Sequence, residues 1–142
     1  MTGYEVGAVV SLRAMHVMPV EGPEGELHEH DYRIEVTASR AELDERGMVV
    51  DLDALRALLA EALDPLRGRD LGPIAPPGAD GVTVEVFARW VHDRVAPALA
   101  EHGAQSLHVR VWESDAEFAG YRAALERAAA SATADHTAPA SR

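Results

Sequence analysis

The chain has 142 residues, of which 47% are hydrophobic and 26% are charged, and this length and composition suit one globular domain with its own core. Its net charge of -11 argues against nucleic acid and an anionic membrane surface as partners, although a local arginine pair could still hold an anionic small molecule. The absence of cysteine excludes disulfides, thiolate metal sites and a cysteine nucleophile. No membrane-length apolar run or signal-like N-terminus is present, which favours a cytoplasmic location.

Two β-strands are predicted in the N-terminal part of the chain. The first covers residues 6–18, where β-favouring side chains follow one another without a proline. A loop rich in proline, glycine and glutamate fills residues 19–26. The second strand covers residues 28–37, where apolar and polar side chains alternate between two faces. Strand, loop and strand indicate an antiparallel pair.

Two helices are predicted next. Asp51 is a good N-cap for a helix whose leucines recur at helical spacing, namely Leu52, Leu55, Leu58, Leu59 and Leu63. Residues 65–81 are rich in proline and glycine and indicate a loop. Thr83 can cap a second helix, in which Pro97 should produce a kink or an early end.

A third strand is predicted over residues 107–113, again with alternating faces. The segment after it starts with Ser114-x-x-Glu117, a capping-box pattern that favours a helix. The final residues are small and polar without periodicity, so we expect a domain over residues 1–128 and a disordered tail over residues 129–142.

Three histidines stand at the ends of apolar rows. On a strand, residues of one parity line one face, so His16 shares a face with Leu12 and Ala14, while His28 and His30 continue the row of Tyr32, Ile34 and Val36. Three imidazoles suit zinc and leave a fourth position for water or substrate. One such histidine is more often a hydrogen-bonded core residue, but three of matching parity predict a zinc site. The other histidines are expected on solvent-facing or helix surfaces: His92, His102, His108 and His136.

Glu113 has the parity of Leu107, Val109 and Val111, which places an acid at the end of a buried row. Burying an unpaired charge is costly. Glu113 therefore either forms a salt bridge, turns to solvent beyond the strand, or accepts hydrogen bonds from a planar N–H pair such as an aminopyrimidinone edge.

Six segments, in order between residues 5 and 122, resemble motifs of the family of 6-pyruvoyl-tetrahydropterin synthase and 6-carboxytetrahydropterin synthase. They match Ala-x-His, His-Gly-His-x-Tyr, Gly-Met-Val-x-Asp, Leu-Asp-His, Pro-Thr-x-Glu and Val-x-Glu-Thr. In this chain they read Ala14-Met15-His16, His28-Glu29-His30-Asp31-Tyr32, Gly47-Met48-Val49-Val50-Asp51, Leu63-Asp64-Pro65, Val82-Thr83-Val84-Glu85 and Val111-Trp112-Glu113-Ser114.

The resemblance implies an α+β T-fold, in which two β-hairpins make an antiparallel sheet with two helices against one face. It implies a short strand near Tyr121 in place of a helix, and a homo-oligomeric barrel, a trimer or hexamer, with active sites between subunits. It also implies zinc ligands at His16, His28 and His30, and a pterin-anchoring glutamate at Glu113, with Thr83 as a lesser candidate.

The acid–base groups depart from the family pattern. The family uses a cysteine four residues before the first histidine of the pair, and the Asp-His of its Leu-Asp-His motif. Here Glu24 occupies the cysteine place and Pro65, which has no proton to move, occupies the histidine place. Relatives that cleave dihydroneopterin triphosphate also resemble this chain in having glutamate at the cysteine place, but they keep the histidine. Glu29 replaces the glycine of His-Gly-His.

These features predict a zinc-dependent lyase or synthase acting on a pterin-like small molecule, such as dihydroneopterin triphosphate or a relative. Glu24 would move a proton, with Asp64 assisting, and Glu113 would hold the ring. The lost histidine makes a re-purposed cyclisation or aldol-type step in a specialised pathway an open alternative. Two others are a non-catalytic zinc- and pterin-binding protein, and a structural zinc site without ligand. Glu24 could also be a solvated loop acid.

Overall fold

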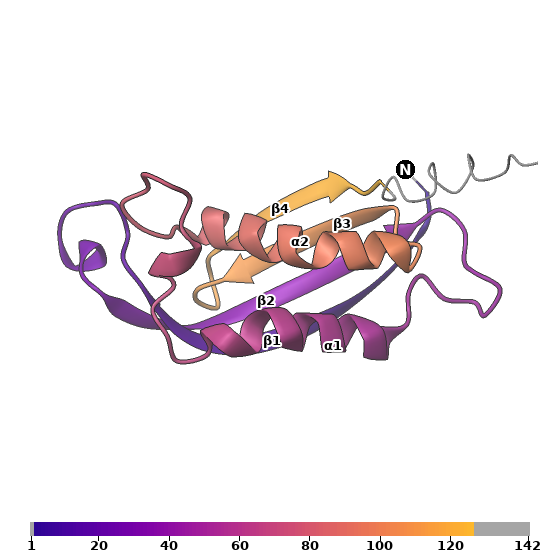
Figure 1. Ribbon diagram of the computed structural model, residues 1–142, viewed down its shortest axis with the longest axis horizontal. Coiled ribbons are helices and arrows are strands. Elements are labelled where there is room, and N and C mark those ends of the chain that lie inside the picture. The colour runs from indigo at the N-terminus through magenta and orange to yellow at the C-terminus, as the bar shows by residue number, and fades with distance from the viewer. Residues whose placement is uncertain (1, 127–142) are drawn as a thin grey trace, which may run out of the picture.

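Four strands form one antiparallel sheet in the order β1-β2-β3-β4, and two helices lie against one of its faces (Figure 1). The structure is a computed structural model that describes residues 2–126. Its strands and helices are β1 (Tyr4–His16), β2 (His28–Arg40), α1 (Leu52–Leu63), α2 (Val84–Glu101), β3 (Ser106–Trp112) and β4 (Phe118–Ala124). Three short 3-10 helices lie in the connections: η1 (Pro23–Gly25), η2 (Asp64–Leu66) and η3 (Gly72–Ile74).

The sheet consists of two hairpins joined edge to edge, as expected for the α+β class. β1 pairs with β2 from Tyr4 opposite Arg40 to His16 opposite His28. β2 pairs with β3, and β3 pairs with β4, in both cases antiparallel. The strand bounds differ slightly from those expected: β1 covers residues 4–16 where 6–18 was expected, and β2 extends to residue 40 where 37 was expected.

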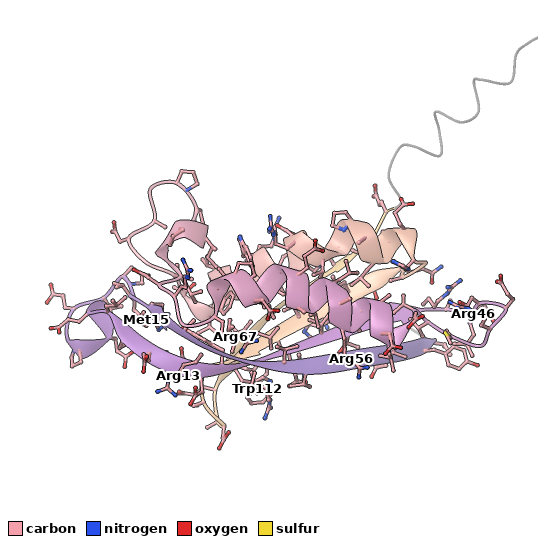
Figure 2. The ribbon with its side chains drawn as sticks, turned by 60° about the horizontal axis from the view of Figure 1, so that its bottom comes forward. Arg13, Met15, Arg46, Arg56, Arg67 and Trp112 are labelled. Carbon is pink, nitrogen blue, oxygen red and sulfur yellow. The ribbon has the colours of Figure 1, made fainter. Side chains whose placement is uncertain are left out.

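The core lies between the sheet and the helices. On the helix-facing side, the even-numbered side chains are buried from Leu12 to His16 in β1 and from Tyr32 to Ala38 in β2, as are the odd-numbered ones of β3. They pack against Leu55, Leu59 and Leu63 of α1 and Phe87 of α2. Arg13 and Trp112 lie on the opposite face, away from both helices (Figure 2). The period-two alternation in the sequence therefore corresponds to two distinct surfaces of the sheet.

Both predicted helix caps are present. The Asp51 carboxylate accepts hydrogen bonds from the backbone N–H groups of Asp53 (2.8 Å) and Ala54 (3.4 Å), and the Thr83 hydroxyl accepts one from Val86 N–H (3.1 Å). The expected early end at Pro97 is not observed, because α2 continues to Glu101. The buried Leu99 and Ala100 lie beyond the proline, so packing on the sheet stabilises this last turn.

The segment after β3 contains the strand β4, so of the two open alternatives the helix favoured by Ser114-x-x-Glu117 is not formed. Ser114 Oγ accepts from Ala116 N–H (3.2 Å), which stabilises a tight turn, and Glu113 N–H donates to the Glu117 carbonyl (3.2 Å). β4 then pairs with β3, with Tyr121 opposite Val109. The strand near Tyr121 that the family resemblance implied is therefore confirmed.

Two further expectations concern the C-terminal tail and membrane-spanning helices. The predicted tail over residues 129–142 lies outside the described residues, as does His136. Within residues 2–126, no helix combines the length and the apolar character that a membrane crossing requires.

Candidate metal centre and ligand site

The three predicted histidines converge at one end of the sheet. His16 ends β1, and His28 and His30 begin β2. The register places His16 opposite His28 and Ala14 opposite His30, with all three imidazoles on the helix-facing side. One ring nitrogen from each lies within 4.8 Å of the others. The sequence prediction that these side chains meet is therefore confirmed.

Backbone carbonyls orient two of the rings. His16 Nδ1 lies 2.7 Å from the Val82 carbonyl oxygen, and His28 Nδ1 lies 2.7 Å from the Glu26 carbonyl oxygen. A carbonyl can only accept, so in both neutral rings Nδ1 carries the proton and Nε2 presents a lone pair. Hydrogen bonds of this kind hold metal-binding histidines in their ligand tautomer.

The two lone-pair nitrogens face each other. His16 Nε2 and His28 Nε2 are 3.0 Å apart, although neither neutral ring can donate to the other. Two histidine nitrogens on one tetrahedral zinc would be separated by about 3.3 Å, given zinc–nitrogen distances of about 2.0–2.1 Å. A shared cation therefore fits this pair of nitrogens.

His30 supplies an unpartnered nitrogen. Its Nε2 is buried and has no hydrogen-bond partner in the part of the chain that the structure describes. Burial lowers the pKa of His16, and the hydrogen bond to the Val82 carbonyl opposes this shift. The neighbouring His28 and His30 lower the pKa of His16 further. The neutral imidazole that zinc requires is thus favoured at His16. The donor set fits a zinc ion.

Glu113 lies beside this cluster, directly after β3. The register that pairs Arg33 with Trp112 places Glu113 opposite Tyr32, on the helix-facing side. Its carboxylate oxygen Oε2 is 3.9 Å from His30 Nε2, and its side chain is 23% exposed. Glu113 therefore lies on the face that its shared parity with Val109 and Val111 predicted.

Glu24 also approaches the histidines. It lies in η1, and its Oε1 is 3.5 Å from His28 Nε2, with the side chain 63% exposed. The loop folds back because the Glu24 carbonyl accepts from Met18 N–H (2.9 Å). The neighbouring Gly25 allows this approach, since a Cβ there would lie 2.1 Å from the Val20 carbonyl oxygen.

The two other predicted site residues have different surroundings. Asp64 is exposed after α1, and its carboxylate pairs with Arg67 (3.3 Å). It is not a member of the three-histidine group. Thr83 caps α2 through its hydroxyl, next to Val82, whose carbonyl orients His16.

The connection before α2 brings Val82 to His16. Met15 N–H donates to the Arg69 carbonyl (2.9 Å), and Val82 N–H donates to the Val17 carbonyl (2.9 Å). A Cβ at Gly81 would lie 2.2 Å from that Val17 oxygen, so the close approach requires glycine. This proline- and glycine-rich connection is therefore part of the candidate metal centre.

Sequence reasoning missed the functional environment of Tyr32. Its ring contacts His16 and His30 edge to face, at centroid distances of 5.8 and 5.5 Å. Its hydroxyl is buried without a partner among the described residues. Burial and, secondarily, Glu113 raise the pKa of Tyr32, so it remains a neutral phenol that can donate a hydrogen bond. Its shared parity with His28 and His30 was the available signal.

The solvent-facing prediction for His92 is wrong. The side chain is buried, with its Nδ1 3.0 Å from an Asp93 carboxylate oxygen and its ring against Tyr121 at 4.7 Å. This burial depends on β4, in the segment where the capping-box pattern favoured a helix and the family resemblance implied a strand. His102 is exposed as expected, and His108 is half-buried on β3.

Glu29 lies between the candidate ligands His28 and His30 but points to the opposite face. Its carboxylate pairs with Arg13 (2.9 Å), which also pairs with Asp31 (3.0 Å). Glu29, where the family resemblance implied a glycine, therefore leaves the candidate metal centre unobstructed.

A model of the family described as 6-pyruvoyl tetrahydropterin synthase matches residues 8–124. No curated protein matches the chain at a significant level of sequence similarity. Among solved structures, 6-pyruvoyl tetrahydropterin synthase from Plasmodium falciparum is similar with a TM-score of 0.74 at 12% identity, covering 88% of this chain and 100% of that one. The Caenorhabditis elegans enzyme has a TM-score of 0.62 at 19% identity, covering 87% and 97%.

A third similar structure is a Plasmodium vivax 6-pyruvoyltetrahydropterin synthase, described as a catalytic-residue mutant in which glutamate is replaced by alanine. Its TM-score is 0.65 at 14% identity, and the match covers 86% of this chain and 99% of that one. At these identities the structural likeness establishes the shared fold.

We predict one zinc ion per subunit, bound by His16, His28 and His30. His28→Ala and His30→Ala should each lose most of the zinc, because each removes one of three protein ligands. Elemental analysis of purified protein measures this, with the exposed His102→Ala as a control that should keep its zinc. Full retention in both ligand variants would contradict the assignment.

Proposed function

The chain belongs to the 6-pyruvoyl tetrahydropterin synthase family, and we propose that it is a zinc-dependent enzyme of the lyase or synthase type acting on a pterin-like small molecule. The observation that carries this proposal is the convergence of three histidines with two carboxylates, Glu113 and Glu24, that approach them from different segments. The substrate would be dihydroneopterin triphosphate or a relative.

Three coordinating side chains favour a reactive centre over a structural one. Structural zinc sites are normally closed by four protein ligands, whereas catalytic sites keep one position open. The group formed by the described residues contains three histidines. When bound, zinc would supply Lewis-acid polarisation of oxygen substituents on the substrate.

Glu113 is the proposed anchor for the ring. A carboxylate accepts at both oxygens, so it can receive two parallel N–H donors from an aminopyrimidinone edge. Its position next to His30 would hold such a ring beside the metal centre. Thr83 is a weaker candidate for a substrate contact, since its hydroxyl already caps α2.

Glu24 is the proposed proton-transfer group. Its carboxylate is largely exposed and lies close to His28, so it can remain ionised and act as a base near the metal centre. The Plasmodium vivax relative, in which a glutamate is described as a catalytic residue, supports a glutamate in this role. Asp64 would assist, although in this subunit its exposed carboxylate pairs with Arg67.

Pro65 argues for an altered reaction. It stands where the family resemblance implies an acid–base histidine, and proline has no proton to transfer. We therefore expect poor activity in the ordinary family reactions and consider a cyclisation or aldol-type step equally compatible with the site. The same substitution supports the second candidate, a zinc- and pterin-binding protein without catalysis. Turnover on a panel of pterin triphosphates and non-pterin analogues distinguishes the two.

Assembly into a barrel is part of the proposal. The outer strands β1 and β4 end the sheet on either side, and exposed edges favour pairing with another chain. Copies of this chain would close the sheet into the trimeric or hexameric barrel that the resemblance implies, with sites between subunits.

We predict a homo-oligomer in solution, because closing a barrel removes both sheet edges. Multi-angle light scattering at micromolar concentration should give the mass of a trimer or a hexamer. A monomeric mass under these conditions would contradict the barrel assembly.

Glu113→Gln should weaken pterin binding by about 2–5 kcal/mol, the usual cost of truncating a buried charge-assisted pair. Calorimetric titration with dihydroneopterin triphosphate measures this, and zinc content and folding should stay unchanged. Glu117→Gln, an exposed change in the same hairpin, is the matched control. Equal affinities for Glu113→Gln and the unsubstituted protein would remove the ring-anchoring role.

Glu24→Gln should reduce turnover by roughly a hundredfold or more, because it removes a general base while keeping side-chain size. The rate is compared with that of Glu21→Gln, which changes an acid of the same loop and should remain active. Activity of Glu24→Gln within a few-fold of the unsubstituted protein would identify Glu24 as a solvated loop acid. Asp64 would then be the next residue to test.

A further inference from the structure

We propose that Tyr32 is a positioning residue whose hydroxyl donates a hydrogen bond to the Glu113 carboxylate and thereby fixes Glu113 beside the three histidines. The expected effect on ligand binding rests on the proposed function, whereas the hydrogen bond itself does not.

The Tyr32 hydroxyl lacks any partner among the described residues, although the residue is only 1% exposed. A buried hydroxyl that loses water without gaining a hydrogen bond is unfavourable, so buried polar groups of this kind almost always have a partner in the functional state. The unpaired donor therefore indicates that a nearby acceptor completes it.

The Tyr32 ring has little freedom to turn its hydroxyl toward solvent. It packs edge to face against Phe87 of α2 at a centroid distance of 5.2 Å, and against His16 and His30 on the sheet. Side chains from three elements thus restrict the ring. The acceptor must come to the hydroxyl, since the hydroxyl cannot move to the acceptor.

Glu113 is the acceptor in the right position. The β2–β3 pairing ends with Arg33 opposite Trp112, so extending it by one residue brings Glu113 opposite Tyr32, and the Glu113 carboxylate lies 3.9 Å from His30 Nε2 on the same face. Cross-strand neighbours of this kind have Cβ atoms about 4.5–5.5 Å apart. The Glu113 side chain is partly exposed and contacts His30 at 3.9 Å, so it retains the freedom to rotate toward Tyr32. A phenol and a carboxylate then form a short, charge-assisted hydrogen bond.

This bond would prepare Glu113 for a ligand. A carboxylate offers about four lone-pair positions, so one bond from Tyr32 leaves acceptors for a planar N–H pair. It also selects one rotamer of Glu113, which reduces the entropy that a ligand must remove on binding. Tyr32 would therefore act through Glu113 and need not touch the substrate.

A double-mutant cycle on the zinc-loaded protein tests the hydrogen bond without any organic ligand. Tyr32→Phe, which removes only the hydroxyl, should keep the zinc and lower the thermal midpoint by roughly 4 °C. In a Glu113→Ala background the same change should have little effect, because the acceptor is gone. Equal shifts in both backgrounds, or no shift in either, would overturn the proposal. Tyr121→Phe serves as the matched control, since the Tyr121 ring packs against His92 and Arg89 of α2 and not against the histidine cluster.

A crystal structure of the zinc-loaded protein provides a second measurement if a variant fails to fold. The Tyr32 hydroxyl oxygen should lie about 2.5–2.7 Å from a Glu113 carboxylate oxygen. A separation beyond hydrogen-bond distance would overturn the proposal.

Binding of dihydroneopterin triphosphate tests the consequence. Where the unsubstituted protein binds it, Tyr32→Phe should weaken the affinity roughly tenfold, as expected for the loss of one charge-assisted bond. Unchanged affinity would overturn the positioning role. Absence of binding by the unsubstituted protein would instead count against the proposed substrate class, while the cycle and the crystal structure still decide the Tyr32–Glu113 bond.

Discussion

The ladder between β1 and β2 determines which side chains can meet at the candidate metal centre. It pairs the two strands over their whole length and places His16 opposite His28, with His30 two residues farther along the same face. A slip of one residue would turn the row of β2 side chains to the other face and separate the histidines. The buried row of Leu12, Ile34 and Val36 resists such a slip, because it would expose those side chains to water.

Hydrogen bonds from outside the sheet then orient the rings. The two carbonyls that accept from His16 and His28 belong to different connections, one just before β2 and one just before α2. The connection before α2 is fastened to the end of β1 by backbone hydrogen bonds, and Gly81 permits the contact. The rigid sheet therefore brings the nitrogens together, while the loops determine which nitrogen of each ring is free to bind a cation.

The sequence predicted the parts of the fold and the site that depend on local patterns. Alternation was enough to place His16, His28, His30 and Glu113 on the helix-facing side, and short-range cap chemistry was enough to locate the starts of both helices. Partners supplied by other segments could not be predicted in this way. The Ser114 capping box favoured a helix, but Ser114 instead stabilises the turn of the β3–β4 hairpin, and the burial of His92 depends on packing of β4 against α2. The hydrogen bonds from His16 to the Val82 carbonyl and from His28 to the Glu26 carbonyl could not be predicted either. Every residue has a carbonyl, and only the loop conformation decides where it points.

The position of Glu29 illustrates how far this strand can diverge. Glu29 stands between two candidate metal ligands, yet its side chain belongs to the other surface, where Arg13 pairs with both Glu29 and Asp31. Exposed ion pairs of this kind contribute little to stability, so substitutions among them have small energetic consequences. Every second position of the strand can therefore change without altering the chemistry on the helix-facing side. Natural selection can thus act on the two surfaces almost independently, which is compatible with a shared fold at only 12% identity to a solved relative.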